Sequence, residues 1–406
     1  MLVAGPRNGP PIRAGSFPVV RGVASHNEAR QLCTMPDFLT SALEVLIGIG
    51  LLFAGGEIFV QGSVTLSLIF GIPQLVIGLT VVSFGTSAPE LFVSISSVLR
   101  GLDSLAVSNV VGSNIFNVMV VLGSSAVVMP LRVESRLVRR DVPVMIAVSA
   151  AVWGMASPGR VTWQSGVALL LALLINSIWE IRTAREEPAG VEGAEPEVNP
   201  DQGKRGILKA VMSLLLGVLL LSVGSRVLVS GASGTATYLG VSEAVIGLTI
   251  VSAGTSMPEL ITSLVAAIKG RTDLAIGNVV GSNLLNQLLV LGASALAAAG
   301  AGGLQVSPLL IQRDMPVMVL TALACMPIFW TKGQITRLEG GILLALYVFY
   351  VVDQVLPRTL PTWQDEFRMV MLCLVVPAVI VVIVVQAGLY WRQLQRKRLK
   401  EPNEVS

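Results

Sequence analysis

The chain has 406 residues, of which 53% are hydrophobic and only 13% are charged, and its formal net charge is +3. A soluble globular protein has roughly 25% charged residues, so this chain has too few charges to cover a soluble surface. The composition excludes a cytosolic enzyme, a disordered protein and a disulfide scaffold, and it predicts an all-α polytopic membrane protein.

Eleven apolar runs are long enough to cross a hydrocarbon core as helices. They span 39–62, 68–99, 104–130, 141–158, 161–181, 207–231, 241–268, 273–301, 313–330, 335–356 and 367–391. We divide the chain into a disordered tail or mis-assigned start at 1–34, a first five-helix repeat at 35–182, a cytoplasmic linker at 183–206, a second five-helix repeat at 207–356, and an eleventh helix with a basic cytoplasmic tail at 357–406.

Lysine and arginine are distributed unequally between the two sides of these spans. If the first span enters from outside, the inner loops and the tail carry eighteen Lys and Arg and the outer loops carry five. Cytoplasmic loops are enriched in these residues. We therefore expect a multi-pass protein of the cell (inner) membrane whose C-terminus is cytoplasmic.

A long internal repeat relates the two halves of the chain. Residues 78–117 and 247–286 align without a gap, and 22 of the 40 positions are identical. Each half contains five expected spans, and an odd number of spans reverses the second half in the membrane. Inverted repeats of this kind are typical of transporters with a binding site near the bilayer midplane.

Each copy of the repeat places the motif GTSxPE inside an apolar span, at 85–90 and at 254–259. The proline of the motif lacks an N–H group and clashes with the carbonyl four residues earlier, so it interrupts the helix. The interruption frees backbone carbonyls around Thr86 and Thr255. Freed backbone at this depth is tolerated only where it is buried in protein or lines a wet cavity.

A glutamate follows each of these prolines, Glu90 in the first copy and Glu259 in the second. A carboxylate inside the bilayer is costly and usually marks an ion site or pathway. Two carboxylates with carbonyl and hydroxyl oxygens form an all-oxygen ligand set, which suits a hard cation such as Ca²⁺ or Na⁺.

Polar residues extend from the motifs as stripes along both neighbouring helices, at helical spacing. The stripes consist of Ser83, Ser87, Glu90 and Ser94, of Ser252, Ser256, Glu259 and Ser263, of Asn109, Ser113 and Asn117, and of Asn278, Ser282 and Asn286. Because lipid offers no polar partners, we expect the stripes to face one another. The alternative for any single serine or asparagine is a hydrogen bond that only packs two helices together.

Other acidic residues lie near the ends of the expected spans and are weaker ligand candidates. We expect interfacial positions for Glu44, Glu57, Glu180 and Glu243. Asp141 and Asp314, which each follow an arginine at a span start, are expected to cap helices.

The duplicated GTSxPE and GNxxGSN-like segments resemble those of the prokaryotic sodium/calcium exchangers, within the cation/Ca²⁺ antiporter superfamily. The resemblance covers both repeats and most of 39–356. It implies that Glu90 and Glu259 bind Ca²⁺ at the midplane together with the main-chain carbonyls of Thr86 and Thr255.

The resemblance also implies sodium sites built from the same glutamates and from hydroxyl groups. The hydroxyl residues are Ser87, Ser256, Ser113 and Ser282. Asn117 and Asn286 occupy the central polar position, and asparagine at both argues against potassium coupling. The eleventh helix at 367–391 departs from the family's core of ten.

The sequence therefore predicts an antiporter that exchanges Na⁺ for Ca²⁺ by alternating access. The alternative is an H⁺/Ca²⁺ antiporter in which the two glutamates are protonated in place of Na⁺ binding. A cation channel is disfavoured by the inverted repeat, and no nucleophile–base set supports an enzyme. The expected partners are the ions and the lipid bilayer, with no cofactor and no nucleic acid.

Overall fold

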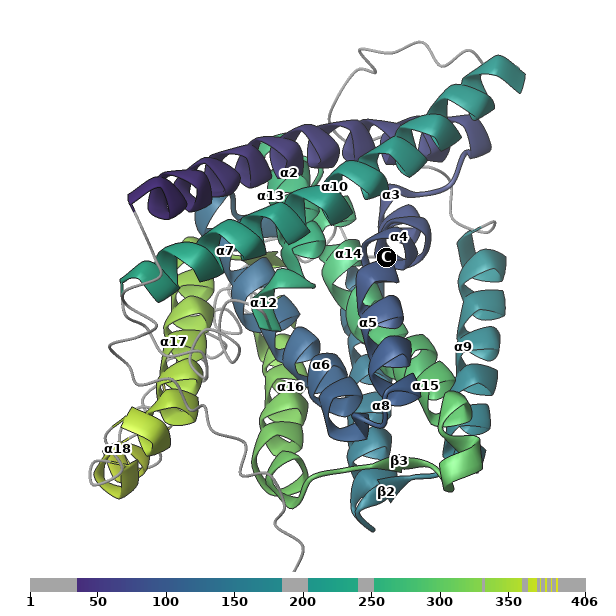
Figure 1. Ribbon diagram of the computed structural model, residues 1–406. Coiled ribbons are helices and arrows are strands. Elements are labelled where there is room, and N and C mark those ends of the chain that lie inside the picture. Colours follow the sequence, from purple (N-terminus) through teal and green to yellow (C-terminus); the bar gives the residue numbers. More distant parts are fainter. Residues whose placement is uncertain are drawn as a thin grey trace, which may run out of the picture.

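The computed structural model describes residues 35–184, 204–239, 252–330, 333–359 and 364–370, and the single residues 373, 377, 381 and 385 (Figure 1). The described part is a bundle of helices joined by short connections. The expected tail at 1–34, most of the linker at 183–206 and of the eleventh helix at 367–391, and Glu243 lie outside the described residues.

The first half is one series of helices with two short strands. Its elements are α2 (Met35–Phe70), α3 (Gln74–Ile77), the π-helical η1 (Gly78–Val82), α4 (Ser83–Thr86), α5 (Ala88–Leu99), α6 (Asp103–Phe116), the π-helical η2 (Asn117–Leu122), α7 (Gly123–Val128), β1 (Leu131–Arg132), the π-helical η3 (Leu137–Asp141), α8 (Val142–Ala156), β2 (Arg160–Val161) and α9 (Trp163–Ala184).

The second half runs through a closely similar series. Its elements are α10 (Lys204–Tyr238), α12 (Ser252–Gly254), α13 (Met257–Ile268), α14 (Thr272–Leu285), the π-helical η5 (Asn286–Val290), α15 (Leu291–Ala297), the 3₁₀ turn η6 (Ala299–Ala301), β3 (Leu304–Gln305), the π-helical η7 (Leu310–Asp314), α16 (Met315–Trp330), β4 (Gln334–Ile335), α17 (Arg337–Thr359) and α18 (Gln364–Val370). That the two halves are inverted five-helix repeats stays a prediction.

Within the described ranges, seven helices are long and apolar enough to cross a membrane, and the broken helix at 74–99 makes an eighth. Three of the eleven expected spans are not among these eight. The span at 141–158 is the 15-residue helix α8. The span at 241–268 is described only from Ser252, and it contains the 12-residue helix α13. The third lies mostly outside the described residues.

The two longest helices, α2 and α10, lie side by side across one end of the bundle (Figure 1). Glycines spaced by seven face the partner helix, at 48, 55 and 62 on α2 and at 217, 224 and 231 on α10. A Cβ added at Gly217 would lie 2.6 Å from the Cβ of Phe59, and one added at Gly48 would lie 2.6 Å from the backbone nitrogen of Leu228. Small residues at a helix interface let the backbones approach closely in a membrane.

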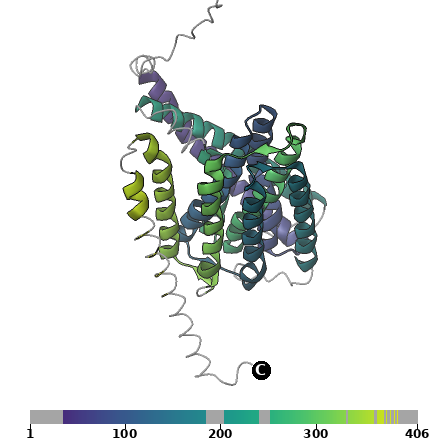
Figure 2. The same ribbon diagram turned by 90° about the horizontal axis from the view of Figure 1, so that it is seen from below.

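The remaining helices form a block beside this pair, and α17 and α18 lie at one edge of the block in both views (Figure 2). Two antiparallel strand pairs join the halves. Strand β1 pairs with β4, and β2 pairs with β3. Each pair therefore ties a connection of the first half to a connection of the second.

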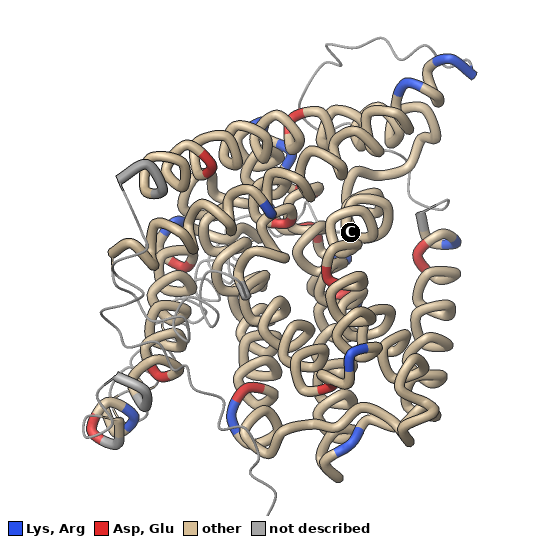
Figure 3. Tube along the Cα trace, in the orientation of Figure 1, with Lys and Arg blue, Asp and Glu red and all other residues tan. Residues whose placement is uncertain are grey.

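Charged residues are sparse along the trace and gather toward helix ends (Figure 3). In one such group Glu180 is only 2% exposed, and its expected interfacial position stays a prediction. The expected capping role of Asp141 is wrong, because its side chain makes no capping hydrogen bond. The Glu180 carboxylate pairs with Arg136 at 2.5 Å and with Arg140 at 2.9 Å. Asp141 lies 3.7 Å from the Arg140 guanidinium. Mutual neutralisation permits these charges to be buried.

The equivalent group in the second half has the same form but different partners. Asp314 pairs with Arg313 at 2.9 Å and accepts hydrogen bonds from Tyr350 and Gln354 on α17. The expected capping role is wrong here as well, since the carboxylate binds side chains of a neighbouring helix. Glu57, in contrast, is half-buried and pairs with Lys269 at the end of α13.

Candidate ion-binding site

The GTSxPE motifs interrupt two helices, as their prolines predict. In the first half the axis bends by 43° between α4 and α5. The residues at the interruptions, Ser87 and Ser256, have backbone angles of φ −82°, ψ 4° and φ −91°, ψ 9°. These angles lie in the sparsely populated region between helix and strand, where many active-site residues are found.

Glu90 and Glu259 each lie in the first turn of the helix that follows the interruption, and both are 0% exposed. Each is held by the serine of the other motif. The Ser256 hydroxyl donates to Glu90 Oε1 at 3.1 Å, and the Ser87 hydroxyl donates to Glu259 Oε1 at 3.2 Å. The two motifs therefore face each other and form a single site.

The electrostatics of this site favour a bound cation. The N-terminus of a helix stabilises a nearby carboxylate, which helps two acidic groups coexist in a buried place. The second oxygen of each carboxylate, Oε2, has no hydrogen-bond partner among the described residues. An unpartnered buried carboxylate oxygen is costly, and a metal ion could satisfy both.

The hydroxyl groups named from the sequence adjoin the carboxylates. Ser256 Oγ lies 3.0 Å from Ser113 Oγ on α6, which is 2% exposed. The Thr86 hydroxyl lies 3.4 Å from that of Ser282 on α14, and both residues are at most 1% exposed. The structure thus places Ser113 and Ser282 each in contact with a residue of a GTSxPE motif.

Asn117 and Asn286 are 0% exposed, and neither side-chain amide has a hydrogen-bond partner among the described residues. Each asparagine is the first residue of a π-helical segment, η2 or η5. Such segments are rare and often occur at functional sites. The pairing of each asparagine with an ion stays a prediction, because no contact with the glutamates is recorded.

Two asparagines that we did not name as site residues have direct contacts with it. Asn109 on α6 bonds to the threonine of the second motif, Thr255, and Asn278 on α14 bonds to that of the first, Thr86. Both belong to the polar stripes of the sequence, and their recurrence in both copies was the signal that could have identified them.

The two ends of the site differ in exposure. Thr86 is 1% exposed and Asn278 is 0% exposed. Their counterparts in the repeat, Thr255 and Asn109, are both half-buried. The Thr255 end of the site is therefore more exposed than the Thr86 end.

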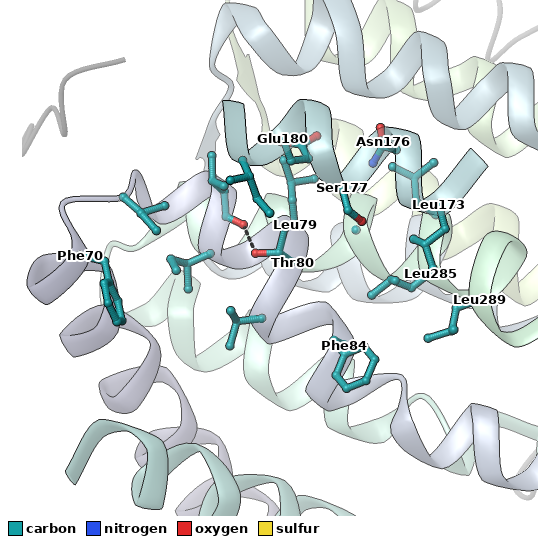
Figure 4. Close-up of a pocket in the computed structure, with 17 residues that line it drawn as sticks. Phe70, Leu79, Thr80, Phe84, Leu173, Asn176, Ser177, Glu180, Leu285 and Leu289 are labelled. Atoms are coloured by element: carbon teal, nitrogen blue, oxygen red, sulfur yellow. Dashed lines mark hydrogen bonds between the residues drawn. The ribbon is translucent and has the colours of Figure 1, made fainter. Parts of the chain in front are cut away.

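A separate cavity of about 770 Å³ lies between η1, α9 and α14 (Figure 4). Its walls are mostly apolar, with Ser177 and Glu180 among the polar groups, and it includes none of the ion ligands named from the sequence. Across the described ranges, no group of three or more His, Cys, Asp or Glu side chains could hold a metal.

A bundle of membrane-spanning helices around two buried carboxylates and many neutral oxygens defines a multi-pass membrane protein with the features of an ion transporter. The sodium/calcium exchanger protein family model matches residues 40–181 and 209–356, which cover most of the chain. The chain belongs to this family, and the resemblance expected from the GTSxPE motifs is confirmed.

Individual relatives agree with this assignment over almost their full length. The putative antiporter CaxA of Alkalimonas amylolytica is 34% identical over 77% of this chain and 98% of its own. The inner membrane protein YrbG of Escherichia coli is 33% identical over 78% and 99%. A structure of the sodium-calcium exchanger NCX_Mj, soaked with 10 mM Na⁺ and zero Ca²⁺, has a TM-score of 0.66 at 30% identity, over 77% of this chain and 98% of that one.

Proposed function

We propose that the chain is an antiporter that exchanges Na⁺ for Ca²⁺ at the site between its two GTSxPE motifs. One observation carries the proposal. Glu90 and Glu259 are fully buried, and each accepts a hydrogen bond from the serine of the opposite motif. Two facing carboxylates supply the charge that one divalent cation needs.

In this proposal Ca²⁺ binds both carboxylates and the main-chain carbonyls of Thr86 and Thr255. Calcium prefers six to eight oxygen ligands, so neutral oxygens complete its shell. Sodium ions use the same glutamates with the hydroxyls of the four motif and stripe serines. They are Ser87, Ser256, Ser113 and Ser282. Because the two ions share ligands, they compete, and competition at one site that opens alternately to either side produces exchange.

The relatives support the substrate class. NCX_Mj is described as a sodium-calcium exchanger in structures soaked with Na⁺, Ca²⁺ or Sr²⁺. The family model covers the segments that contain Glu90 and Glu259, because it matches residues 40–181 and 209–356. The relative YrbG is named an inner membrane protein, which supports the same location here. The excess of Lys and Arg in the expected inner loops and tail supports a cytoplasmic C-terminus.

Proton-coupled Ca²⁺ transport is the second candidate. It is favoured by the unpartnered Oε2 atoms of Glu90 and Glu259, since a buried carboxylate without a partner can take up a proton. The serine hydroxyls favour sodium, because a proton needs no further ligands.

Uptake of radioactive calcium into vesicles that contain the purified protein separates the two candidates. We expect an outward Na⁺ gradient to drive uptake and a proton gradient of equal size, without Na⁺, to have no effect. Uptake that follows the proton gradient and ignores Na⁺ would overturn the sodium proposal.

A further inference from the structure

Asn278 on α14 connects the two halves of the site through both ends of its side-chain amide. Its Nδ2 donates to the main-chain oxygen of Glu259 at 3.3 Å and to the hydroxyl of Ser263 at 2.9 Å. Its Oδ1 accepts from the hydroxyl of Thr86 at 3.2 Å. The donor side thus contacts the second half of the chain, and the acceptor side contacts the first half.

Asn109 on α6 makes the same contacts with the halves exchanged. Its Nδ2 donates to the main-chain oxygen of Glu90 at 3.3 Å and to the hydroxyl of Ser94 at 3.0 Å. Its Oδ1 accepts from the hydroxyl of Thr255 at 3.2 Å. The arrangement recurs in both halves with distances that agree within 0.1 Å, so it is a regular feature of the site.

We propose that Asn109 and Asn278 are positioning residues that fix the threonine carbonyls of the site relative to the glutamates. This inference rests on the proposed function, in which those carbonyls and carboxylates bind Ca²⁺. Each asparagine holds the glutamate-bearing helix of its own half and the threonine of the other half. The threonine and glutamate ligands, which come from different halves of the chain, are thereby held at a fixed distance from each other.

The chemistry of the amide explains why asparagine suits this position. The glutamate main-chain oxygen can accept a second hydrogen bond, and the threonine hydroxyl can donate one. A neutral amide supplies both on one short side chain, whereas an aspartate would add a third negative charge beside the two glutamates. Selectivity among hard cations depends on cavity size, ligand number and site flexibility, so a fixed spacing contributes to the choice of ion.

The same two helices provide matched controls on another face. Asn283 on α14 and Asn114 on α6 are both 2% exposed, and their amides point to the sulfur atoms of Met145 at 3.6 Å and Met318 at 3.8 Å. Asn283 shares residue type, helix and burial with Asn278, and Asn114 shares residue type and helix with Asn109. Among the described residues, no hydrogen bond links either control to the glutamates.

The test is a double-mutant cycle between Asn278→Ala and Thr86→Val in the full-length protein. Valine has the shape of threonine and keeps the main-chain carbonyl, but it lacks the hydroxyl that donates a hydrogen bond to Asn278. We expect each single variant to raise the KM for Ca²⁺ about fivefold, and the double variant to raise it no further. The preference for Ca²⁺ over Sr²⁺ should fall together with the affinity, because the larger ion suits a looser site.

Asn283→Ala should leave both the KM and the Ca²⁺/Sr²⁺ ratio within about twofold of wild type. Independent effects of Asn278→Ala and Thr86→Val, which multiply to about 25-fold in the double variant, would overturn the inference. A lower transport rate with unchanged KM and unchanged ion preference would overturn it as well, since a purely structural role predicts that result.

A second cycle between Asn109→Ala and Thr255→Val tests the inference where the side chains are half-buried and the protein better tolerates truncation. The shift in unfolding temperature on addition of Ca²⁺ to the purified protein gives a readout that does not depend on transport. If wild type shows this shift but no Na⁺-driven flux, the exchange proposal fails, and both cycles still decide the positioning role through Ca²⁺ and Sr²⁺ binding.

Discussion

In the proposed ion site, the carboxylates of Glu90 and Glu259 are the central groups, because both are acidic and fully buried. An isolated buried carboxylate would be strongly destabilising. Here each has one oxygen bonded to a serine and one oxygen without a partner. This half-satisfied state is what an ion site requires, since the unpartnered oxygens remain available for the cation.

We expect Glu90→Gln and Glu259→Gln each to reduce Ca²⁺ flux at least about a hundredfold, because each removes a charge whose attraction for the ion exceeds roughly 3 kcal/mol. The amide is close in shape, so the protein should still fold. The control is Glu339→Gln, at a buried glutamate whose Oε2 accepts from the backbone N–H of Thr336 at the start of α17. Glutamine can accept the same bond. Robust flux in either motif variant would remove the site assignment.

Serine substitutions should weaken Na⁺ binding more than Ca²⁺ binding. Ser113→Ala and Ser282→Ala each remove a hydroxyl that touches the motif residues, at 3.0 Å from Ser256 and 3.4 Å from Thr86. We expect the Na⁺ concentration for half-maximal exchange to rise about three- to tenfold, with a smaller change in Ca²⁺ affinity. Calcium keeps both glutamates, whereas Na⁺ has few strong ligands. Flux measured against each ion decides this, and an equal loss for both would contradict it.

At the scale of elements, the glycine-lined contact between α2 and α10 sets their separation. The glycines recur every seven residues on both helices, and Cβ atoms added at 48, 55, 217, 224 and 231 would lie within 3.0 Å of the partner helix. Van der Waals packing at this short separation stabilises the pair, because the hydrophobic effect does not drive helices together in lipid. The pair therefore behaves as one packed unit across the end of the bundle.

Gly217→Ala should destabilise the protein by about 1–3 kcal/mol, because the new methyl group meets the backbone and Cβ of Phe59. Gly50→Ala on α2 is the matched control, since nothing lies within 4 Å of a Cβ added there. Alanine also favours helix over glycine, so this variant should be at least as stable as wild type. Unfolding temperatures of the purified proteins test the pair, and equal temperatures would show that the contact is not close-packed.

The sequence predicted the helix interruptions, because the effect of a proline on its helix is local. It also predicted that the two motifs face each other, because the polar stripes recur in both copies of the repeat. It did not predict which half each asparagine contacts, since Asn109 and Asn278 could have been turned toward their own threonine. The rotation of packed helices decides this. The burial of Glu180 was missed for the same reason, because its partners Arg136 and Arg140 precede it by about forty residues and meet it only in the folded bundle.

At the scale of the whole molecule, the site is made only where the two halves meet. Hydrogen bonds from Ser87 to Glu259 and from Ser256 to Glu90 cross between halves, and both strand pairs do the same. The two ends of the site differ in exposure, since Thr86 is 1% exposed and Thr255 is half-buried. That the two ends open in turn stays part of the proposed mechanism of alternating access.

The charge of the site predicts how exchange responds to a membrane potential. The two glutamates balance one Ca²⁺, and the neutral Asn117 and Asn286 add no charge. The serine hydroxyls and threonine carbonyls offer more oxygens than two Na⁺ would use, so we expect at least three Na⁺ to replace each Ca²⁺. Each cycle then moves net positive charge in the direction of sodium, and a potential of 100 mV contributes about 2.3 kcal/mol per charge.

In Na⁺-loaded vesicles, an inside-positive potential set by a potassium ionophore should therefore accelerate Ca²⁺ uptake, and an inside-negative potential should slow it. The control is the ionophore with equal potassium on both sides. Uptake that is indifferent to the potential would mean that two monovalent ions replace each Ca²⁺, and the hydroxyl groups would then not provide a third sodium site.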